Sequence, residues 1–563
     1  MFRLFVLISA VSAPLALQPA AALSTSTAPA VSWNDWVSLN ASVGGRLHVS
    51  GPLALPCFSS FAGHPTHPDP PECAAIQHNY TDPLFRSAHF GAFMNPQWEI
   101  CQTTDAGCVL DSADPTDPSA FTGVDCELGN IAPAYIDVQA VKDIQAAYTF
   151  SRKTGVRLSV KNKGHDYKGR SAGRNSLSLW MVFDAHFQPE TCNTSYRAIT
   201  IGTGVRMEQL YQFADANNVT AIGGYHRTIG TGYFLVRGHS ILSPVYGLAV
   251  DRTVEIKIVT PDGQYRTANE CQNSNLFWAL RGGGGSAFGV VTEITVRVEP
   301  RLTLQAAIIR LPANASLDTL AAWYELTVNN SLRWGEQGWG GHITAASIIH
   351  VNPLLNNSAA QSSMQVAIDF ATSHGGSGLV DELPSWYAFF EKYVTSAEAP
   401  VGAELMLGTR LLNTSLFATE AGRASLSTAI TNLLPFATPY IIVGTPLLYP
   451  YVEGTTSVTP AWRSALWHFG FPIEFAFNDT AGARQTIYQE VTQHVQVFRD
   501  LTPGSGAYFN EGDVYEPNHE QAYWGPNYAR LLQIKDTYDP DHLMDCWQCG
   551  TSGTYLVANH GSS

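Results

Sequence analysis

Apolar residues recur with two different periods between residues 127 and 300, which predicts a unit that mixes helices and strands. Residues 137–151 place three apolar side chains on one helical face, namely Val141, Ile144 and Tyr148. The next segment, VRLSV, alternates apolar and polar residues and predicts a strand, and the alternation resumes in residues 177–181. A glycine-rich loop, KNKGHDYKGRSAG, joins these two predicted strands.

A second unit repeats this pattern further along the chain. It predicts a strand at residues 199–201, a helix with Met207, Leu210 and Tyr211 on one side, and a second glycine-rich loop, GGYHRTIGTG. The segment VEIKIVTPDGQYRT predicts a hairpin, because Asp-Gly suits the tight turn between its strands. The unit closes with LFWALRGGGGSAFGVVTEITVRV. Glycines thus stand where strands end, which lets the backbone approach a ligand closely.

The composition changes after residue 300, so we predict a second domain with helices such as LDTLAAWYELTVNNSL and strands such as SMQVAIDFAT. The tail then returns to dense aromatic and charged sequence. A chain of 563 residues exceeds what one hydrophobic core usually serves. We therefore divide it into a signal peptide, a disulfide-stapled segment, the glycine-rich domain, the second domain and a returning C-terminal segment, at 1–22, 23–126, 127–300, 301–500 and 501–563.

The N-terminus, MFRLFVLISAVSAPLALQPAAALS, has one arginine, an apolar run too short to span a bilayer, and small residues at positions 20–22. This pattern favours a secretory signal, cleaved near residues 20–24, over a buried strand. Sequons for N-glycosylation follow at Asn40, Asn79, Asn193, Asn218, Asn314, Asn329, Asn356, Asn413 and Asn478. We therefore expect a secreted, extracellular glycoprotein.

The nine cysteines agree with an oxidising compartment, since five of them crowd the region before residue 127, where we expect disulfides. Their odd number leaves at least one thiol unpaired or otherwise engaged. For the CWQC pair, Cys546 and Cys549, a structural bridge is favoured over a redox dithiol because no thioredoxin-like pattern surrounds it. The formal charge of −15 makes nucleic acid a poor partner.

The glycine-rich loops do not match G-x-G-x-x-G or G-x-x-x-x-G-K-[ST], so Rossmann and P-loop nucleotide sites are disfavoured. Instead, GHDYKGRS, RGHSILSPVYG and FWALRGGGG follow in this order within one domain. Backbone N–H groups of such loops can converge on an anionic diphosphate. Lys163, Lys168 and Arg170 add positive charge to the first loop.

With these motifs and the tail segment WGPNYARL, the chain resembles the vanillyl-alcohol oxidase and para-cresol methylhydroxylase flavoproteins, in their fungal berberine-bridge-enzyme-like branch, which includes isoamyl-alcohol-oxidase-like proteins. The resemblance is strong over residues 125–300 and clear over 508–538. It implies an α+β fold: a two-part FAD-binding domain of the vanillyl-alcohol oxidase type with an inserted α+β substrate domain.

The same resemblance implies FAD as the cofactor, with a single covalent link from His165 to the flavin 8α carbon. An imidazole there withdraws electron density and should raise the flavin potential. The tail motif nominates Asn527 and Tyr528 as cofactor contacts. The other FAD-binding residues that it implies are Lys163, Gly164, Asp166, Gly169, Arg170, Ser171, His226, Thr228, Ile229, Gly230, Gly238, His239, Ser240 and Val291. We expect no metal site.

One loop departs from the family pattern. Many members carry a second covalent link from a cysteine in a GGxCPTVG-like loop, whereas this chain reads GGYHRTIG with His226 in that place. A second thioether is therefore ruled out there, and His226 is either a packing residue or a hydrogen-bond partner near the flavin. Ile229 occupies a position thought to control oxygen reactivity in the family, so the speed of the reaction with oxygen stays open.

Tyr508 and Asn510 in GAYFNEGD are the candidate catalytic residues, with His468 in ALWHFGF as a third. Oxidation of an alcohol needs a group that takes the hydroxyl proton while hydride passes to the flavin. A tyrosine has an ordinary pKa of ~10, so it needs a cationic or hydrogen-bonding neighbour for this role. We expect a strand that places Tyr508 and Asn510 on one face. His468 is alternatively a satisfied histidine beside Trp467, and Glu511 a solvated loop carboxylate.

We therefore expect a secreted FAD-dependent oxidase that transfers hydride from a small alcohol, amine or secondary-metabolite substrate to FAD and electrons to oxygen, releasing hydrogen peroxide. One alternative is a flavin-containing cyclase or isomerase without net redox, and another is a cofactor-free secreted binding glycoprotein. The expected partners are a small-molecule substrate and molecular oxygen, with no nucleic acid and no membrane. Substrate identity, disulfide connectivity and oligomeric state stay open.

Overall fold

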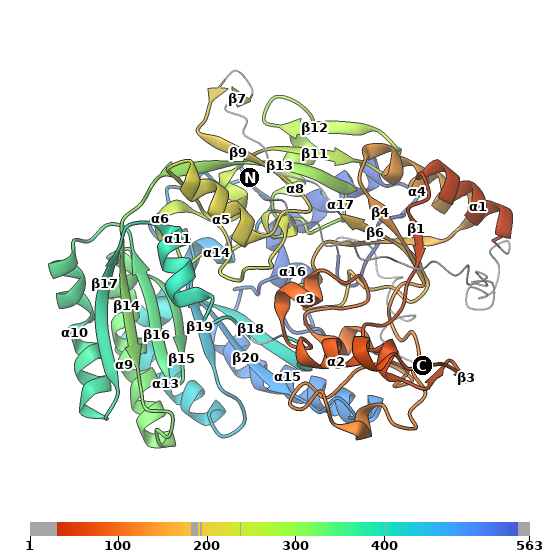
Figure 1. Cartoon of the computed structure of the whole chain (residues 1–563). Helices are drawn as coiled ribbons and strands as arrows, with labels where there is room; N and C mark the ends of the chain where they lie inside the picture. Colours follow the sequence, from red (N-terminus) through yellow and green to blue (C-terminus); the bar gives the residue numbers. More distant parts are fainter. Residues whose placement is uncertain (1–30, 182–189, 192–193, 237, 400, 550–563) are drawn as a thin grey trace, which may run out of the picture.

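The computed structural model describes residues 31–181, 190–191, 194–236, 238–399 and 401–549. The predicted signal peptide, Cys192 and the sequon at Asn193 lie outside these residues. In the described part of the chain, no helix is both long enough and apolar enough to cross a membrane. Three larger sheets, of four, five and seven strands, organise the fold, and they occupy separate regions in Figure 1.

The first glycine-rich loop belongs to the four-stranded sheet, whose strand order is β1-β4-β6-β5. Strands β4, β6 and β5 run parallel and β1 antiparallel to β4. Helix α4 packs its predicted apolar face, with Ile144 and Tyr148 fully buried, and ends at Gly155, whose φ of 73° suits glycine. The elements are β1 (Leu47–Val49), β4 (Ala134–Val138), α4 (Val141–Thr154), β5 (Arg157–Lys161) and β6 (Ser176–Met181).

The five-stranded sheet holds the predicted hairpin, since β11 pairs antiparallel with β12 across the turn that contains Gly263. Strand β13 lies beside β11 and also pairs with β9 and β10. The elements are β9 (Ala198–Gly202), α5 (Met207–Ala216), β10 (Val219–Ala221), η4 (Thr231–Phe234), α6 (Ser243–Tyr246), α7 (Ala249–Arg252), β11 (Thr253–Val259), β12 (Tyr265–Asn269), α8 (Ser274–Leu280) and β13 (Val290–Pro300). The short strands β7 (Glu190–Thr191) and β8 (Thr194–Ser195) pair with each other.

The inserted part is a seven-stranded antiparallel sheet with the order β17-β14-β16-β15-β19-β20-β18. Its long helices, α9, α10, α13 and α15, flank the sheet (Figure 1). The strands are β14 (Leu304–Arg310), β15 (Gly340–Thr344), β16 (Ser347–Asn352), β17 (Ser377–Leu383), β18 (Leu405–Asn413), β19 (Tyr440–Val443) and β20 (Ala465–Glu474). The helices are α9 (Leu317–Glu336), α10 (Asn357–Ser373), α11 (Trp386–Phe389), the π-helix η5 (Phe390–Val394), α12 (Thr414–Ala418), α13 (Glu420–Leu433), α14 (Ala461–Ser464) and α15 (Ala481–Leu501).

One predicted strand is wrong, because SMQVAIDFAT lies within helix α10. Its buried residues Met364, Ala367 and Ala371 follow the helical spacing of three and four. The side chain of Asn356 caps the helix by accepting from the N–H of Ala359. The predicted helix LDTLAAWYELTVNNSL is confirmed as α9.

Two disulfides, Cys57–Cys73 and Cys108–Cys126, staple the N-terminal segment as predicted. Cys101 is a buried free cysteine there, and Cys271 is disulfide-bonded. The elements of this segment are α1 (Trp33–Ser42), η1 (Leu55–Cys57), β2 (Ser60–Phe61), β3 (His64–Pro65), α2 (Pro70–His78), α3 (Pro83–Ser87), η2 (Pro96–Trp98) and η3 (Pro118–Ala120).

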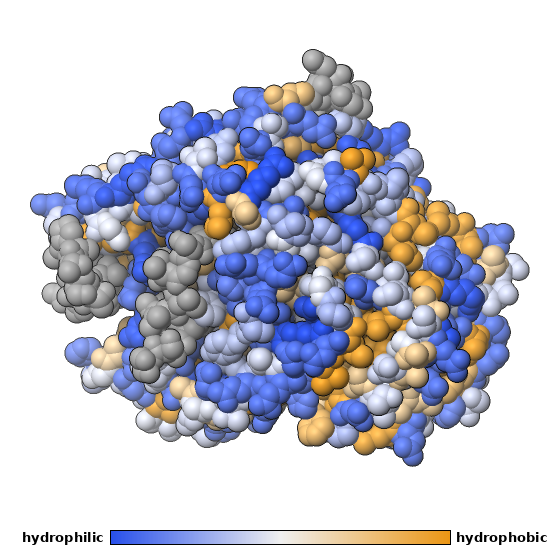
Figure 2. Space-filling model, turned by 180° about the vertical axis from the view of Figure 1, so that it is seen from behind, coloured by the Kyte–Doolittle hydropathy of each residue, from blue (hydrophilic) through white to orange (hydrophobic). Residues whose placement is uncertain are grey.

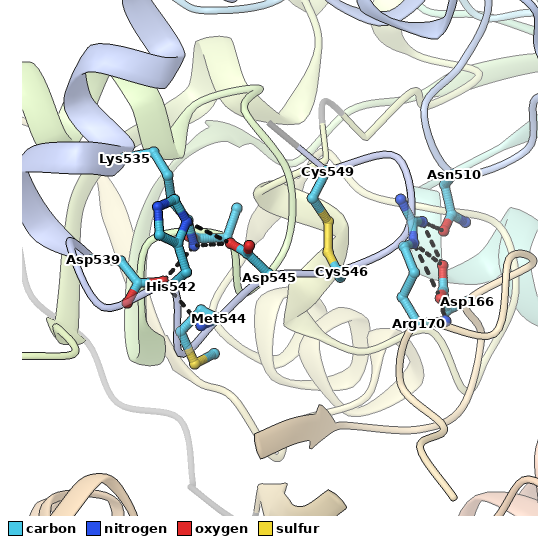
Figure 3. The surroundings of a disulfide bond; sticks show 11 residues. Asp166, Arg170, Asn510, Lys535, Asp539, His542, Met544, Asp545, Cys546 and Cys549 are labelled. Atoms are coloured by element: carbon cyan, nitrogen blue, oxygen red, sulfur yellow. Dashed lines mark hydrogen bonds and ion pairs between the residues drawn. A yellow bond between two sulfur atoms is a disulfide. The ribbon is translucent and has the colours of Figure 1, made fainter. Parts of the chain in front are cut away.

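After α15 the chain returns to the glycine-rich domain through α16 (His519–Tyr523), η6 (Gly525–Asn527) and α17 (Tyr528–Tyr538). The buried Lys535 donates to the carbonyl of Ala287 and pairs with Asp539, which fixes α17 against the end of the GGGGS loop. Cys546 and Cys549 form a disulfide in this returning segment (Figure 3).

The outer surface is mainly hydrophilic when the molecule is seen from behind, and hydrophobic residues gather on the side of the seven-stranded sheet (Figure 2). Eight of the nine sequon asparagines belong to the described residues, and none of these eight is buried. Their side chains are therefore placed where a glycan can extend into solvent.

Candidate active site

A cavity of about 660 Å³ lies between the glycine-rich domain and the inserted sheet. Residues of the loop 162–171 and the loop 224–239 line one part of it, and strands β15, β16 and β19 line another. The segment 508–511 contributes from the returning C-terminal part. The cavity thus gathers segments that are far apart in the sequence, in the size range of small-molecule and cofactor sites.

Most of the sequence-predicted cofactor residues line this cavity. Those that do are Lys163, Gly164, His165, Asp166, Arg170, Ser171, His226, Ile229, Gly230, His239 and Val291. Gly169 packs against Trp98, where a Cβ would come within 2.6 Å of the ring. Gly238 has a φ of 50°, and the N–H of Ser240 bonds Ser243 Oγ, so these two residues shape the turn that presents His239.

The charges of the first loop do not all face the cavity. Arg170 binds the carboxylate of Asp166 and donates to Asn510 Oδ1 at 3.2 Å, which ties the loop to the C-terminal segment (Figure 3). Lys168 is buried and donates to Tyr523 Oη and Gln548 Oε1 instead. Of the three predicted cations of this loop, Lys163 is therefore the one that lines the cavity and makes no ion pair with a described residue.

His165 lies in a chain of neutral polar groups. Its Nε2 is 2.7 Å from Thr228 Oγ1, which is 3.1 Å from Nδ1 of His226. Burial, with a smaller contribution from His226, lowers the pKa of His165 well below its usual value. Burial likewise lowers the pKa of His226 to about 4. At neutral pH both imidazoles are uncharged, so a lone pair on His165 is available for bonding.

His226 is thus a hydrogen-bond partner rather than only a packing residue. Its Nδ1 also lies 3.7 Å from Glu398, whose carboxylate is bound by Arg227. Its Nε2 is buried and has no hydrogen-bond partner among the described residues, and the side chain lines the cavity.

The predicted catalytic residues come together only in part. Tyr508 lines the cavity and sets its ring edge-on to the rings of His239 and His468, at centroid distances of 4.9 and 5.7 Å. Asn510 lines the cavity as well and accepts from Arg170. The expected strand is wrong, because Tyr508 ends an irregular stretch and its carbonyl accepts from the N–H groups of Glu511 and Gly512, which closes a turn.

His468 stands on β20 beneath the cavity wall and is fully buried. Its interpretation as a satisfied histidine is wrong, since neither ring nitrogen has a hydrogen-bond partner in the part of the chain that the structure describes. Burial lowers the pKa of His468 to about 3, so the ring is neutral. Its Nδ1 lies 3.8 Å from Glu511 Oε2.

Glu511 is the site residue that the sequence interpretation missed. It is not a solvated loop carboxylate: its side chain is 13% exposed, lines the cavity and accepts a hydrogen bond from Tyr440 Oη at 2.9 Å. Its other oxygen lies 3.5 Å from His239 Nε2. The only sequence signal was its position directly after Tyr508 and Asn510.

Asn527 and Tyr528 are placed outside the cavity lining. Asn527 donates to the carbonyl of Val458 at 2.9 Å, and Tyr528 packs its ring on Trp524. Trp524 in turn donates to the carbonyl of Gly282 at the start of the GGGGS loop. The WGPNYARL segment therefore contacts the start of the GGGGS loop and does not reach the cavity through Asn527 or Tyr528.

FAD fits the donor set of the cavity. Several buried polar atoms of its lining have no partner among the described residues, namely Asn162 Oδ1, Arg170 Nη1, Ser171 Oγ, Thr203 Oγ1 and His226 Nε2. Buried polar groups are normally hydrogen-bonded, so this cluster indicates a ligand rich in donors and acceptors. Positive φ values of 80° at Gly164 and 70° at Gly169 let the loop turn tightly around such a ligand.

Comparisons with known proteins identify the family of this chain. Residues 132–269 match the family model described as FAD binding domain, and residues 507–545 match the one described as berberine and berberine like. FAD-linked oxidoreductase ffsJ of Aspergillus flavipes is 40% identical over 96% of this chain and 95% of its own length. FAD-linked oxidoreductase OXR2 of Pyricularia oryzae is 37% identical over 92% and 91%, respectively.

Among solved structures, the VAO-type flavoprotein MtVAO615 of Myceliophthora thermophila C1 matches with a TM-score of 0.78 at 26% identity, covering 92% of this chain and 95% of that one. The predicted fold class and family are therefore confirmed. The chain belongs to the FAD-linked oxidoreductases and has the fold of the VAO-type, berberine-bridge-enzyme-like flavoproteins.

Proposed function

We propose that this chain is a secreted FAD-dependent oxidase that links its cofactor covalently to His165 alone and oxidises a small alcohol or secondary-metabolite substrate, with oxygen as the electron acceptor and hydrogen peroxide as the product. The observation that supports it most is one cavity that holds both a neutral His165 and the polar cluster around Tyr508.

FAD bound in this cavity would supply a hydride acceptor for the substrate and pass the electrons on to oxygen. His165, Asp166, Arg170, Ser171 and His226 would hold the cofactor. Thr228 contacts Nε2 of His165, so Nδ1 is the nitrogen left for the covalent bond. Because the ring is neutral and held by Thr228, it is ready as a nucleophile without a separate deprotonation.

A single link is supported by the residue at position 226. Glucooligosaccharide oxidase of Acremonium strictum, which shares this fold at 19% identity and a TM-score of 0.60, carries a 6-S-cysteinyl, 8α-N1-histidyl FAD. In this chain His165 can make the histidyl bond, but His226 has no sulfur for the second one. We infer that the flavin has one protein attachment.

Secretion predicts N-linked glycans on the mature chain. Expressed in a fungal host with its own N-terminus, the protein should leave the cell without residues 1–22 and run faster on a denaturing gel after N-glycosidase treatment. N-terminal sequencing of the secreted form checks the cleavage. An unchanged mobility, or a chain that stays inside the cell with its leader, would contradict this part of the proposal.

Tyr508→Phe tests the substrate side. Its hydroxyl is proposed as the proton acceptor or as a group that positions one, so its loss should slow anaerobic flavin reduction roughly tenfold to a hundredfold. Covalent flavin content should stay at the wild-type level, because the proposed attachment is made by His165 in the first glycine-rich loop and Tyr508 lies on the returning C-terminal segment. Stopped-flow flavin absorbance measures the reduction rate, and the absorbance of the redissolved acid-precipitated protein measures the covalent flavin content. Reduction at the wild-type rate would make Tyr508 a cavity wall only.

The reaction class itself is tested by a screen of primary, secondary and benzylic alcohols, read by peroxide release. We expect at least one alcohol to give peroxide in proportion to carbonyl product. Carbonyl product without peroxide would remove oxygen as the acceptor, and no reaction with any alcohol would contradict the substrate class.

A further inference from the structure

The proposed oxidation leaves one buried carboxylate of the cavity without a role. We propose that Glu511 is the base that takes the hydroxyl proton of the substrate, and that Tyr440 and His239 hold its carboxylate in place beside the neutral ring of His468. The inference rests on the proposed alcohol oxidation and names the residue that accepts the proton in it.

Glu511 differs in its charge pairing from the other carboxylates of the cavity lining. Three of these four pair with a permanent cation, namely Asp166 with Arg170, Glu398 with Arg227, and Asp545 with Lys535, and the fourth, Glu474, is exposed. Among the described residues Glu511 makes no ion pair with a lysine or arginine, and the nearest basic groups to its carboxylate are two histidine rings. A buried acid without a permanent cation is costly for the fold, and such groups gather at functional sites.

The two carboxylate oxygens of Glu511 have different neighbours. Oε1 lies 3.5 Å from His239 Nε2, whereas Oε2 accepts from Tyr440 Oη at 2.9 Å and lies 3.8 Å from His468 Nδ1. Tyr225 Oη extends the network, at 3.3 Å from the other nitrogen of His239. The possible ligand atoms of His239, His468 and Glu511 also lie within 4.8 Å of one another, a spacing that could hold a metal ion, and the chelator test below separates that role from the role of a base.

Hydrogen-bonded backbone carries Glu511 and the residues around it. Tyr440 stands on β19 and His468 on the adjacent β20, where Tyr440 is opposite Gly470 and Ile442 is opposite His468. The turn that carries Glu511 is closed by hydrogen bonds from the N–H groups of Glu511 and Gly512 to the carbonyl of Tyr508. Two neighbouring strands and a closed turn therefore hold the carboxylate, as a positioned base requires.

The surroundings also keep Glu511 ionised. Burial alone would raise the pKa of this carboxyl, but its other interactions, led by the one with His239 and including the hydrogen bond from Tyr440, outweigh burial and hold it below its usual value. The other groups facing this cluster are neutral, because burial raises the pKa of the tyrosines and lowers that of His342 to about 3; they are Tyr167, Tyr225, Tyr233, Tyr440 and His342. Glu511 is thus a base in its reactive form at neutral pH.

The step balances with a flavin as oxidant. The O–H bond of the alcohol breaks and its proton passes to the Glu511 carboxylate. The adjacent C–H bond breaks, its hydrogen leaves with both electrons to the oxidised flavin, and the carbon–oxygen bond becomes the C=O of the product. Glu511 then returns the proton to solvent through the cavity.

The test compares Glu511→Gln, Glu511→Asp and the wild type in anaerobic flavin reduction, with the alcohol that reduces the wild-type flavin fastest. Glu511→Gln should be about a hundredfold to ten-thousandfold slower, and Glu511→Asp should lie between the two. The rate of flavin reduction in the wild type should fall as pH drops through the pKa of Glu511. This fall should be absent in Glu511→Gln. Glu490→Gln, on an exposed position of α15, is the matched control and should match the wild type.

Two readouts do not depend on turnover. The acid-precipitated flavin content of Glu511→Gln should equal that of the wild type, which shows that the variant folds and binds FAD. The infrared difference between wild type and Glu511→Gln at neutral pH should show the loss of an ionised carboxylate. Loss of a protonated carboxyl instead, or flavin reduction of Glu511→Gln at the wild-type rate, would overturn the proposal.

The remaining outcomes are also decisive. If dialysis against a chelator abolishes reduction and a divalent metal restores it, the cluster is a metal site and Glu511 is not the base. If no alcohol reduces the wild-type flavin, the proposed function fails, and with it the role of Glu511. If the alcohol reduces the flavin of the wild type and of Glu511→Gln at the same rate, the role of Glu511 is rejected and the proposed function stands.

Discussion

His165→Ala is expected to leave no flavin in the acid-precipitated protein, whereas the wild-type pellet stays yellow. The reason is that His165 is the half-buried, neutral imidazole of the glycine-rich loop and lines the cavity. The substitution removes the nucleophile but keeps the positive φ values of Gly164 and Gly169 that shape the loop. Non-covalent FAD can therefore still bind to the variant, and it should be lost on denaturation.

His226→Ala is the matched control for this experiment. Its ring packs at 4.8 Å from that of His165 and makes no covalent bond in the proposal. The control should keep its acid-stable flavin, measured by absorbance of the redissolved pellet. A yellow pellet from His165→Ala would contradict the single link through His165, and a colourless one from His226→Ala would show that attachment also requires His226.

The second large effect concerns stability. Arg499 on α15 binds Asp513 at 2.8 Å and Glu516 at 2.7 Å, and all three side chains are buried. Arg499→Met would leave Asp513 without its cation and Glu516 with only Arg410, at 3.9 Å, which costs about 3–5 kcal/mol of unfolding free energy for a broken buried pair. The midpoint of denaturant unfolding, followed by tryptophan fluorescence, should drop accordingly.

This clamp also bears on the active site, because Asp513 follows Glu511 by two residues. Loosening it should reduce alcohol oxidation as well as stability. Arg310→Met, at an exposed position of β14, is the control and should change the unfolding free energy by less than about 0.5 kcal/mol. Equal stability of Arg499→Met and the wild type would show that the buried charges are compensated elsewhere.

The FAD-binding half of the fold could be predicted because its information is local. Helix α4 and strands β5 and β6 follow the periodicity of their own residues, and the glycines mark the loops between them. The first loop could be assigned from its motif, and His165 indeed faces the cavity. Helix α10 was missed because SMQVAIDFAT also suits a strand over a short window, and only the longer spacing of its buried residues identifies a helix.

The substrate side could be predicted only in part, because it is assembled over long range. Tyr508 was found from its motif, but the burial of Glu511 depends on Tyr440 and His468, which come from two strands of the inserted sheet. No local pattern around Glu511 contains that information. For the same reason, the motif with Asn527 and Tyr528 could be identified while its position behind the glycine loop could not.

The central claim is that substrate oxidation reduces the bound flavin. Its most direct test mixes the purified holoenzyme anaerobically with the best alcohol of the screen and follows flavin absorbance. We predict full bleaching with one carbonyl product per flavin, and return of the oxidised spectrum with one peroxide on admission of oxygen. Product formed while the flavin stays oxidised would instead assign the chain to cyclisation or isomerisation and contradict an oxidase.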